Sequence, residues 1–164
     1  MTLFHGSVIL ATLLCALVAG FVFAFAVVAM PGIGTLGDRE FLRAFQVIDR
    51  VIQDRNPVFI AVWAGSMVAT VVALAVGWNQ VAGMERLLLV GAAAVFLLGV
   101  QAPTLTVNVP LNNQLQTLDL QTADESTVAQ AREAFEALWN RWNVIRTVFA
   151  VFSTVLWVIL LLRL

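Results

Sequence analysis

The side chains best suited to chemistry in this sequence lie close together near its C-terminal end. Trp139, Asn143 and Arg146 follow at spacings of four and three, so a helix places them on one face, with Trp142 as the alternative to Asn143. Arg146 lies near the start of a long apolar segment, where burying a guanidinium in a membrane is costly unless it is paired or hydrogen-bonded. Ionisable residues inside a membrane-spanning segment are therefore functional candidates. We therefore take Arg146 as the centre of a candidate polar site.

Partners for Arg146 are expected from two other segments, one around Pro110 and one amphipathic stretch earlier in the chain. The candidates are Asn108, Asn112, Asn113, Gln46, Asp49 and Arg50. An ion pair of Arg146 with Asp49 would favour a structural clamp, whereas a guanidinium surrounded by Asn108, Asn112 and Asn143 would leave donors free for an anionic oxygen. The sequence leaves both interpretations open.

The composition indicates that the surrounding solvent is a lipid bilayer. Apolar residues make up 61% of the 164 residues and charged residues only 12%, against about 25% charged residues in a soluble domain. All nine basic residues are arginine and ten acids offset them, so no basic field exists for nucleic acid. A single cysteine, Cys15, and a single histidine, His5, exclude an intramolecular disulfide, a cysteine-based zinc site and a histidine cluster. We expect no metal site.

Four apolar segments are long enough to span a bilayer, at about 3–30, 58–77, 87–109 and 144–162. The first is expected to span rather than to be cleaved, because it lacks a basic start and exceeds a signal-peptide core. Proline and polar residues interrupt the third segment, a polar connection follows over 111–125, and a helical pattern resumes near Ser126. Residues 38–55 show apolar side chains at spacings of three and four, which is typical of an amphipathic helix.

The sequence therefore predicts an all-α integral membrane protein, an up-down four-helix bundle with an additional amphipathic helix between spans one and two, as a single domain over residues 1–164. The two long connections hold most of the arginines: Arg39, Arg43, Arg50, Arg55, Arg132, Arg141 and Arg146. This distribution predicts a multi-pass protein of a bacterial inner membrane with both termini outside. Small residues recur every fourth position in 61–77, which favours close helix packing within the chain or in a homo-oligomer.

Four motifs, kept in order and spacing, resemble the anthrone oxygenase-like family over nearly the whole chain. They are Met30-Pro31-Gly32, the stretch Phe45-Gln46-Val47-Ile48-Asp49-Arg50 before Asn56-Pro57, the segment Asn108-Val109-Pro110-Leu111-Asn112-Asn113-Gln114-Leu115, and Trp139-Asn140-Arg141-Trp142-Asn143-Val144-Ile145-Arg146-Thr147. The resemblance implies oxygenation of anthrones to anthraquinones in aromatic polyketide pathways, with no flavin, haem or metal as cofactor. Most bacterial relatives have no assigned reaction.

The resemblance also implies which residues would carry such chemistry. The positions that match the family motifs are Gln46, Asn56, Asn108, Asn112, Trp139, Trp142, Asn143 and Arg146. Arg146, Asn112 and Asn143 would donate to an oxyanion, and Asp49, or alternatively Glu136, would serve as the base. Aromatic rings would stack on the substrate. We therefore expect catalytic roles for Arg146, Asn143, Asn112 and Asp49, and substrate contacts from Gln46, Phe45, Asn56, Asn108, Trp139 and Trp142.

Two other functions remain open. A non-catalytic membrane module that binds a lipid-like ligand or a partner helix accounts for the small-residue ridges without any chemistry. Transport is less favoured, because the spans lack the chains of acids and histidines of a proton-driven pump. The expected partners are membrane lipid and a hydrophobic aromatic small molecule.

Overall fold

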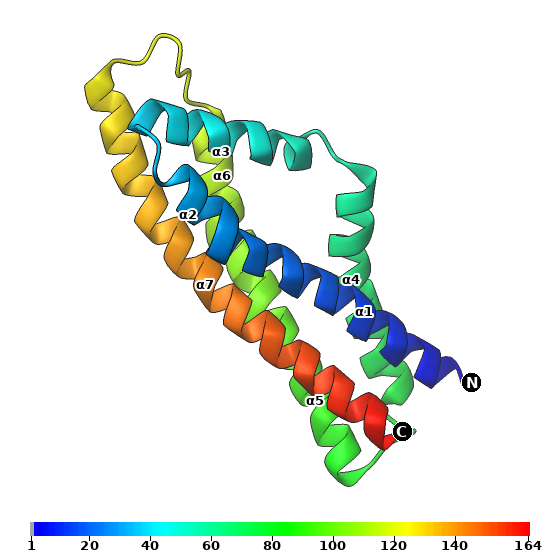
Figure 1. Cartoon of the computed structure of the whole chain (residues 1–164). Coiled ribbons are helices and arrows are strands. Elements are labelled where there is room, and N and C mark those ends of the chain that lie inside the picture. Colours follow the sequence, from blue (N-terminus) through cyan, green and yellow to red (C-terminus); the bar gives the residue numbers. More distant parts are fainter. Residues whose placement is uncertain (1) are drawn as a thin grey trace.

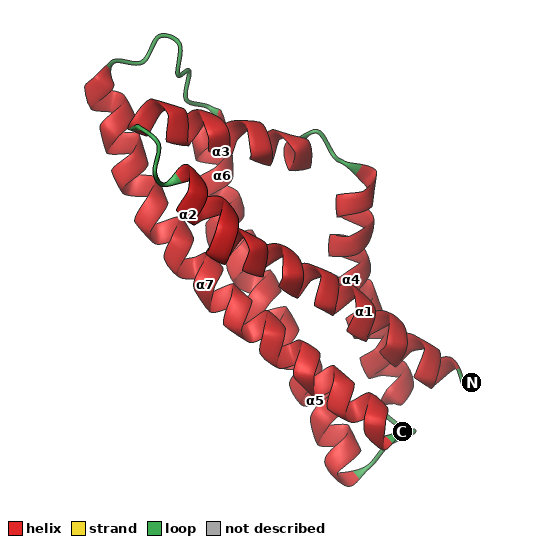
Figure 2. Ribbon diagram, viewed as in Figure 1, coloured by secondary structure: helices red, strands yellow, loops and turns green. Residues whose placement is uncertain are grey.

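The computed structural model describes residues 2–164 as helices joined by short connections, with no strand in that range. Four long helical rods form a bundle. They lie side by side, and both ends of the chain lie at the same end of the bundle (Figures 1 and 2). The predicted all-α four-helix membrane fold is confirmed. The rods are α1 (Leu3–Ala24) with η1 (Phe25–Ala29) and α2 (Met30–Ile33); α4 (Pro57–Gly77); α5 (Gly83–Phe96) with η2 (Leu97–Gln101), η3 (Thr104–Asn108) and α6 (Val109–Gln116); and α7 (Glu125–Arg163).

Each rod is long and apolar enough to cross a membrane: Leu3–Ile33, Pro57–Gly77, Gly83–Gln116 and Glu125–Arg163. Their outward faces carry large apolar side chains that would be unfavourable in water, among them Leu13, Val68, Leu98 and Phe152. The predicted single domain over 1–164 includes residue 1, which lies outside the described residues. The rods begin and end beyond several of the predicted span limits, because polar helical turns extend the apolar segments.

Three prolines lie inside the rods rather than ending them. A π-helical segment of five residues ends two positions before each of Pro31, Pro103 and Pro110. Proline lacks an N–H and its ring crowds the carbonyl four residues earlier, which a wider turn relieves. In each case the residue before the proline donates its backbone N–H to the carbonyl five residues earlier, as a π turn requires. The first rod therefore continues through Met30-Pro31-Gly32, where the sequence predicted its end, and the third continues through Pro103 and Pro110.

Helix α3 (Asp38–Gln53) crosses one end of the bundle between α2 and the start of α4 (Figure 1). Its buried face carries Phe41, Leu42, Phe45 and Asp49. The apolar spacing predicted the first three, but it also placed Ile48 and Val51 on this face, and these are 36% and 55% exposed. The apolar side chains of that face pack on Phe135 and Trp139 of α7 and form one of two core clusters. The other cluster lies nearer the termini.

The connection before α7 is fixed by a helix cap. The side chain of Asp124 accepts the backbone N–H of Thr127 at 2.7 Å, so α7 begins at Glu125, next to the predicted Ser126. This hydrogen bond, together with contacts from Ser126, lowers the pKa of the Asp124 carboxyl.

Candidate functional site

A cavity of about 180 Å³ lies between the two core clusters, with α3 across one end. It is lined by Phe21, Phe25, Phe45, Asp49, Ile52, Phe59, Trp63, Thr104, Leu105, Asn108, Val109, Asn112, Trp139 and Arg146. These side chains come from all four rods and from α3. The polar members therefore depend on the whole fold for their positions.

Arg146 is 5% exposed and has no carboxylate partner among residues 2–164. One terminal nitrogen donates to the Thr104 hydroxyl and the other to the Asn143 side-chain oxygen, both at 2.9 Å. The buried Nε has no protein partner. The guanidinium lies 5.7 Å from the Trp139 ring. Since two neutral groups hold the cation, N–H groups remain for an anionic oxygen in the cavity.

Asp49 is the acid of the cavity, and it is 2% exposed. Its oxygens accept from Asn112 at 2.8 Å, from Gln116 at 2.9 Å and from Gln53 at 3.1 Å. All three donors are neutral amides, and no arginine in the described chain pairs with this carboxylate. A carboxylate offers about four lone-pair sites, so one remains for a proton from a ligand.

One amide connects this acid to the face that holds Arg146. Asn112 donates to Asp49, and its side-chain oxygen accepts the Trp139 indole N–H at 2.8 Å. Asn108 donates to the Trp139 carbonyl at 3.4 Å, and its own side-chain oxygen is buried without a partner. Asn143 donates to the Val22 carbonyl at 3.0 Å, which connects α7 to α1. Hydrogen bonds therefore join α3 and three of the four rods around the cavity, and α4 contributes aromatic side chains only.

Aromatic rings form much of the remaining wall. Phe59 and Trp63 of α4 stack with ring centroids 5.4 Å apart, and Phe21 packs edge-on against Phe59 at 5.3 Å. On the other side Phe45 packs edge-on against Trp139 at 5.2 Å. Such surfaces favour a flat, apolar ligand.

Four predicted site residues are absent from the cavity lining. Asn143 lies behind Arg146, where its oxygen accepts from the guanidinium and its amide donates to the Val22 carbonyl, so it holds Arg146 and does not face the cavity. Gln46 donates to the carbonyls of Leu115 and Leu118, so it joins α3 to the end of α6. Asn56 caps α4 by accepting the first free backbone N–H groups of that helix. Trp142 lies on another face of α7, in a shallow surface depression with Val95, Leu98 and Phe149. Of the two residues that the spacing allowed beside Arg146, the structure places Asn143 there.

Glu136, the alternative base, is also absent from the cavity lining. Its carboxylate pairs with Arg132 at 2.7 Å, and Arg132 also holds the carbonyls of Gly34 and Leu36 and the carboxylate of Asp38. Glu136 is thus part of a clamp between α7 and the turn before α3. The structure leaves Asp49 as the carboxylate that faces the cavity.

Several residues of the site were missed by the sequence reasoning. Thr104 holds Arg146, while Gln53 and Gln116 hold Asp49. The aromatic wall uses pairs at a spacing of four residues within the first two spans, Phe21 with Phe25 and Phe59 with Trp63. The sequence shows this spacing, but apolar spans commonly contain aromatic pairs four residues apart, so the spacing alone does not indicate a cavity wall.

A comparison with known protein families shows which family the chain belongs to. A family model described as anthrone oxygenase matches residues 50–156, more than half of the chain. The chain belongs to the anthrone oxygenase family. No curated protein and no solved structure matches it. The match includes Asn108, Asn112, Trp139, Asn143 and Arg146, and begins one residue after Asp49. In residues 2–164 of this anthrone oxygenase family member, no group of three or more His, Cys, Asp or Glu side chains is arranged to hold a metal ion.

Proposed function

We propose that this member of the anthrone oxygenase family oxidises a flat, hydrophobic aromatic carbon acid of the anthrone type with molecular oxygen. The observation that carries the proposal is that Asp49 and Arg146 line one cavity, carry opposite charges and are not paired with each other. A base and an oxyanion stabiliser are the two groups that such a reaction requires of a protein.

Proton removal is the first step. The acidic methylene and the carbonyl of an anthrone lie at opposite corners of its central ring. Asp49 takes the methylene proton through the lone pair that its amide donors leave free. The negative charge moves to the carbonyl oxygen, where the N–H groups of Arg146 stabilise it. Arg146 does this without losing an ion-pair partner, because it has none in the described chain.

Oxygen completes the reaction. The electron pair of the enolate carbon forms a carbon–oxygen bond to O₂, which is reduced to a peroxide and takes the proton that Asp49 holds. Asp49 then removes the second methylene proton, the new carbonyl forms, and the oxygen–oxygen bond breaks. The hydroxide that leaves accepts the proton from Asp49 as water. One anthrone and one O₂ become one anthraquinone and one water, and Asp49 is regenerated.

The cavity wall also supports a substrate that comes from the bilayer. Leu105 and Val109 line the cavity and are 57% and 36% exposed, on the outward face of a membrane-spanning rod. These apolar residues would face acyl chains, so a hydrophobic substrate would reach the cavity without crossing water. A dry, apolar surrounding also strengthens the electrostatic contribution of Arg146.

We further place the protein in a bacterial inner membrane, with α3 on the cytoplasmic side, on the distribution of its arginines. A cysteine introduced at Gln121, in the connection before α7, tests this orientation. In intact cells a membrane-impermeant maleimide should leave that cysteine unlabelled, and it should label it after the cells are lysed. Labelling in intact cells would reverse the orientation.

The test of the reaction compares Asp49→Asn with Asp54→Asn, an exposed acid at the end of the same helix. Membranes with each variant and with wild type are assayed for oxygen consumption and anthraquinone formation, above the spontaneous rate in membranes without the protein. Asp49→Asn should lower the rate about 10²-fold or more, the usual contribution of a positioned base, while Asp54→Asn should match wild type. Equal rates for both variants would refute the proposed chemistry, and a wild type that binds the anthrone without consuming oxygen would favour the non-catalytic binding module.

A further inference from the structure

A second concave site lies on the far side of α3 from the cavity. It is a groove of about 450 Å³ between α3 and the connection that follows α6. Its lining consists of Arg39, Arg43, Gln46, Val47, Arg50, Gln116, Thr117, Leu118, Asp119, Leu120 and Gln121. The proposed oxidation uses none of the three arginines, so the groove requires an explanation of its own.

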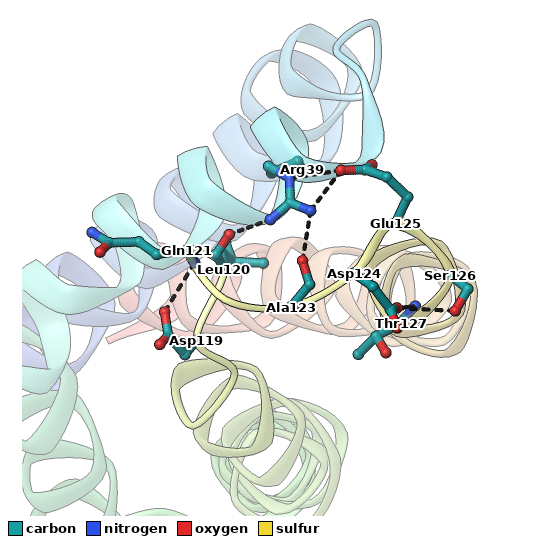
Figure 3. Close-up of polar contacts among 9 residues, drawn as sticks. All are labelled: Arg39, Asp119, Leu120, Gln121, Ala123, Asp124, Glu125, Ser126 and Thr127. Carbon is teal, nitrogen blue, oxygen red and sulfur yellow. Dashed lines mark hydrogen bonds and ion pairs between the residues drawn. The ribbon is translucent and has the colours of Figure 1, made fainter.

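One of the arginines is already neutralised. Arg39 pairs with Glu125 at 2.6 Å and donates to the carbonyls of Leu120 and Ala123, which holds the connection against α3 (Figure 3). The single acid of the groove, Asp119, is also engaged, because it accepts the backbone N–H of Gln121 and the hydroxyl of Thr122. These contacts shape the wall of the groove. Because the donors to Asp119 are neutral, its carboxylate stays negative, and the two remaining arginines exceed it by one positive charge.

Arg43 and Arg50 are exposed and have no ion pair within residues 2–164. They lie on one face of α3, two turns and about 10 Å apart along the helix axis. Two extended arginine side chains at this separation can both reach one phosphate group. A guanidinium binds phosphate through two parallel N–H groups. Gln121, whose side-chain amide is a further donor, lines the groove from the connection that follows α6.

Between the two arginines α3 presents one apolar side chain to the groove, Val47, next to Gln46. Val47 is 62% exposed and lies midway along the same face, and Val51 continues the apolar surface one turn further. Since α4 begins its span at Pro57, α3 lies where headgroups meet acyl chains. An interfacial helix that carries exposed valines beside arginines can bind a molecule with both an anionic group and a hydrocarbon chain. The arginines would contact the anionic group, and the valines would contact the chain.

We propose that this groove binds the phosphate headgroup of an anionic glycerophospholipid, with Arg43 and Arg50 on the phosphate and Val47 against the start of an acyl chain. A free phosphate compound shares the headgroup chemistry but not the chain, so the acyl contact distinguishes the two. The proposal does not depend on the oxidation assigned to the cavity, since its residues and its test are separate.

The test measures thermal unfolding of the purified full chain in neutral detergent. Phosphatidylglycerol, phosphatidylcholine with the same chains, and glycerol 3-phosphate are titrated into wild type, into Arg43→Gln/Arg50→Gln, and into Arg86→Gln/Arg141→Gln. The last variant removes the same charge from outside the groove. Wild type and this control should be stabilised by phosphatidylglycerol at about tenfold lower concentration than by phosphatidylcholine, the effect expected of one to two basic residues at an anionic headgroup. The groove variant should show no such preference.

Three results would overturn the proposal: an unchanged preference in the groove variant, an equal loss in the control, or full stabilisation by glycerol 3-phosphate. If Arg43→Gln/Arg50→Gln does not fold, Val47→Asp replaces it, because a carboxylate in the groove repels the phosphate and leaves both arginines in place. In wild type, high salt should reduce the preference for phosphatidylglycerol, since an exposed charge contact is screened. A preference that salt does not change would count against the arginines.

Discussion

Trp139 donates its indole N–H to the side-chain oxygen of Asn112 at 2.8 Å, and the amide of Asn112 donates in turn to Asp49. Because an amide has one acceptor end and one donor end, the indole fixes which end faces the acid. The Trp139 ring also lies beside the Arg146 guanidinium. One residue of α7 thus sets the geometry at both charged groups of the cavity.

Trp139→Phe should therefore lower the turnover rate while the bundle stays folded. The ring is kept, but Asn112 loses its donor and is free to turn away from Asp49. We expect a decrease of about tenfold, in line with the cost of leaving a buried polar group without its partner. Turnover is measured as anthraquinone formed per protein in reconstituted membranes. Trp142→Phe is the matched control, since Trp142 lies outside the cavity, and equal rates for the two variants would contradict this role of Trp139.

Arg146→Lys should retain the positive charge and lose the two separate terminal nitrogens of the guanidinium. A lysine ammonium cannot hold Thr104 and Asn143 with two separate nitrogens, as the guanidinium does. We expect kcat to fall about 10²-fold, the usual loss when an oxyanion donor is removed, with a smaller change in KM. Steady-state kinetics on Arg146→Lys and on the exposed Arg141→Lys separate the two parameters. A wild-type kcat for Arg146→Lys would show that the guanidinium only ties helices together.

Gly77→Ala should destabilise the contact between α4 and its neighbours. A Cβ at this position would lie 2.3 Å from a ring carbon of Phe4 and 2.7 Å from a methyl carbon of Leu89, both of which are buried. We expect a loss of about 1 to 3 kcal/mol, the usual cost of overpacking a core. Denaturant unfolding in detergent measures it. At Gly20 no heavy atom lies within 4 Å of the added carbon, so Gly20→Ala should be neutral or stabilising.

Acid should loosen the start of α7. The pKa of Asp124 is lower in the folded chain than its ordinary value of 3.8, so the cap contributes fully above that value and is lost as the pH falls through the folded pKa. Amide exchange at Thr127 should therefore accelerate in that range. In Asp124→Asn the cap persists without a titrating group, so its exchange rate should not show this acid-dependent increase. Parallel acceleration in both proteins would assign the effect to another group.

Helical periodicity predicted much of this architecture. The apolar lengths located the four rods, and the apolar spacing in 38–55 predicted α3 as an amphipathic helix. That spacing counted Ile48 and Val51 with the apolar face and Asp49 with the polar residues, whereas the structure exposes both aliphatic side chains and buries Asp49, because amides of α6 hold its carboxylate. The Asn143 position beside Arg146 was one of two that the spacing allowed. Periodicity does not separate Trp142 from Asn143, because steps of three and four both fit a helix, and packing against α1 and η3 decides between them.

The three π segments were beyond such reasoning. Proline usually ends or kinks a helix, so Pro31 and Pro103 suggested interruptions. The widened turns instead keep the rods continuous, and Thr104 at the start of η3 is placed to hold Arg146. The amides around Asp49 were equally hidden, because Gln53 and Gln116 meet only when α3 folds across the end of α6.

The central claim is that Asp49 removes a proton from a carbon acid bound beside Arg146. It is tested most directly by deuterium exchange into the methylene of anthrone in heavy water without oxygen, which isolates proton transfer from oxidation. Wild-type membranes should incorporate deuterium faster than membranes without the protein and faster than membranes with Asp49→Asn, while Asp54→Asn should match wild type. Incorporation at the background rate by wild type, or at the wild-type rate by Asp49→Asn, would contradict the claim.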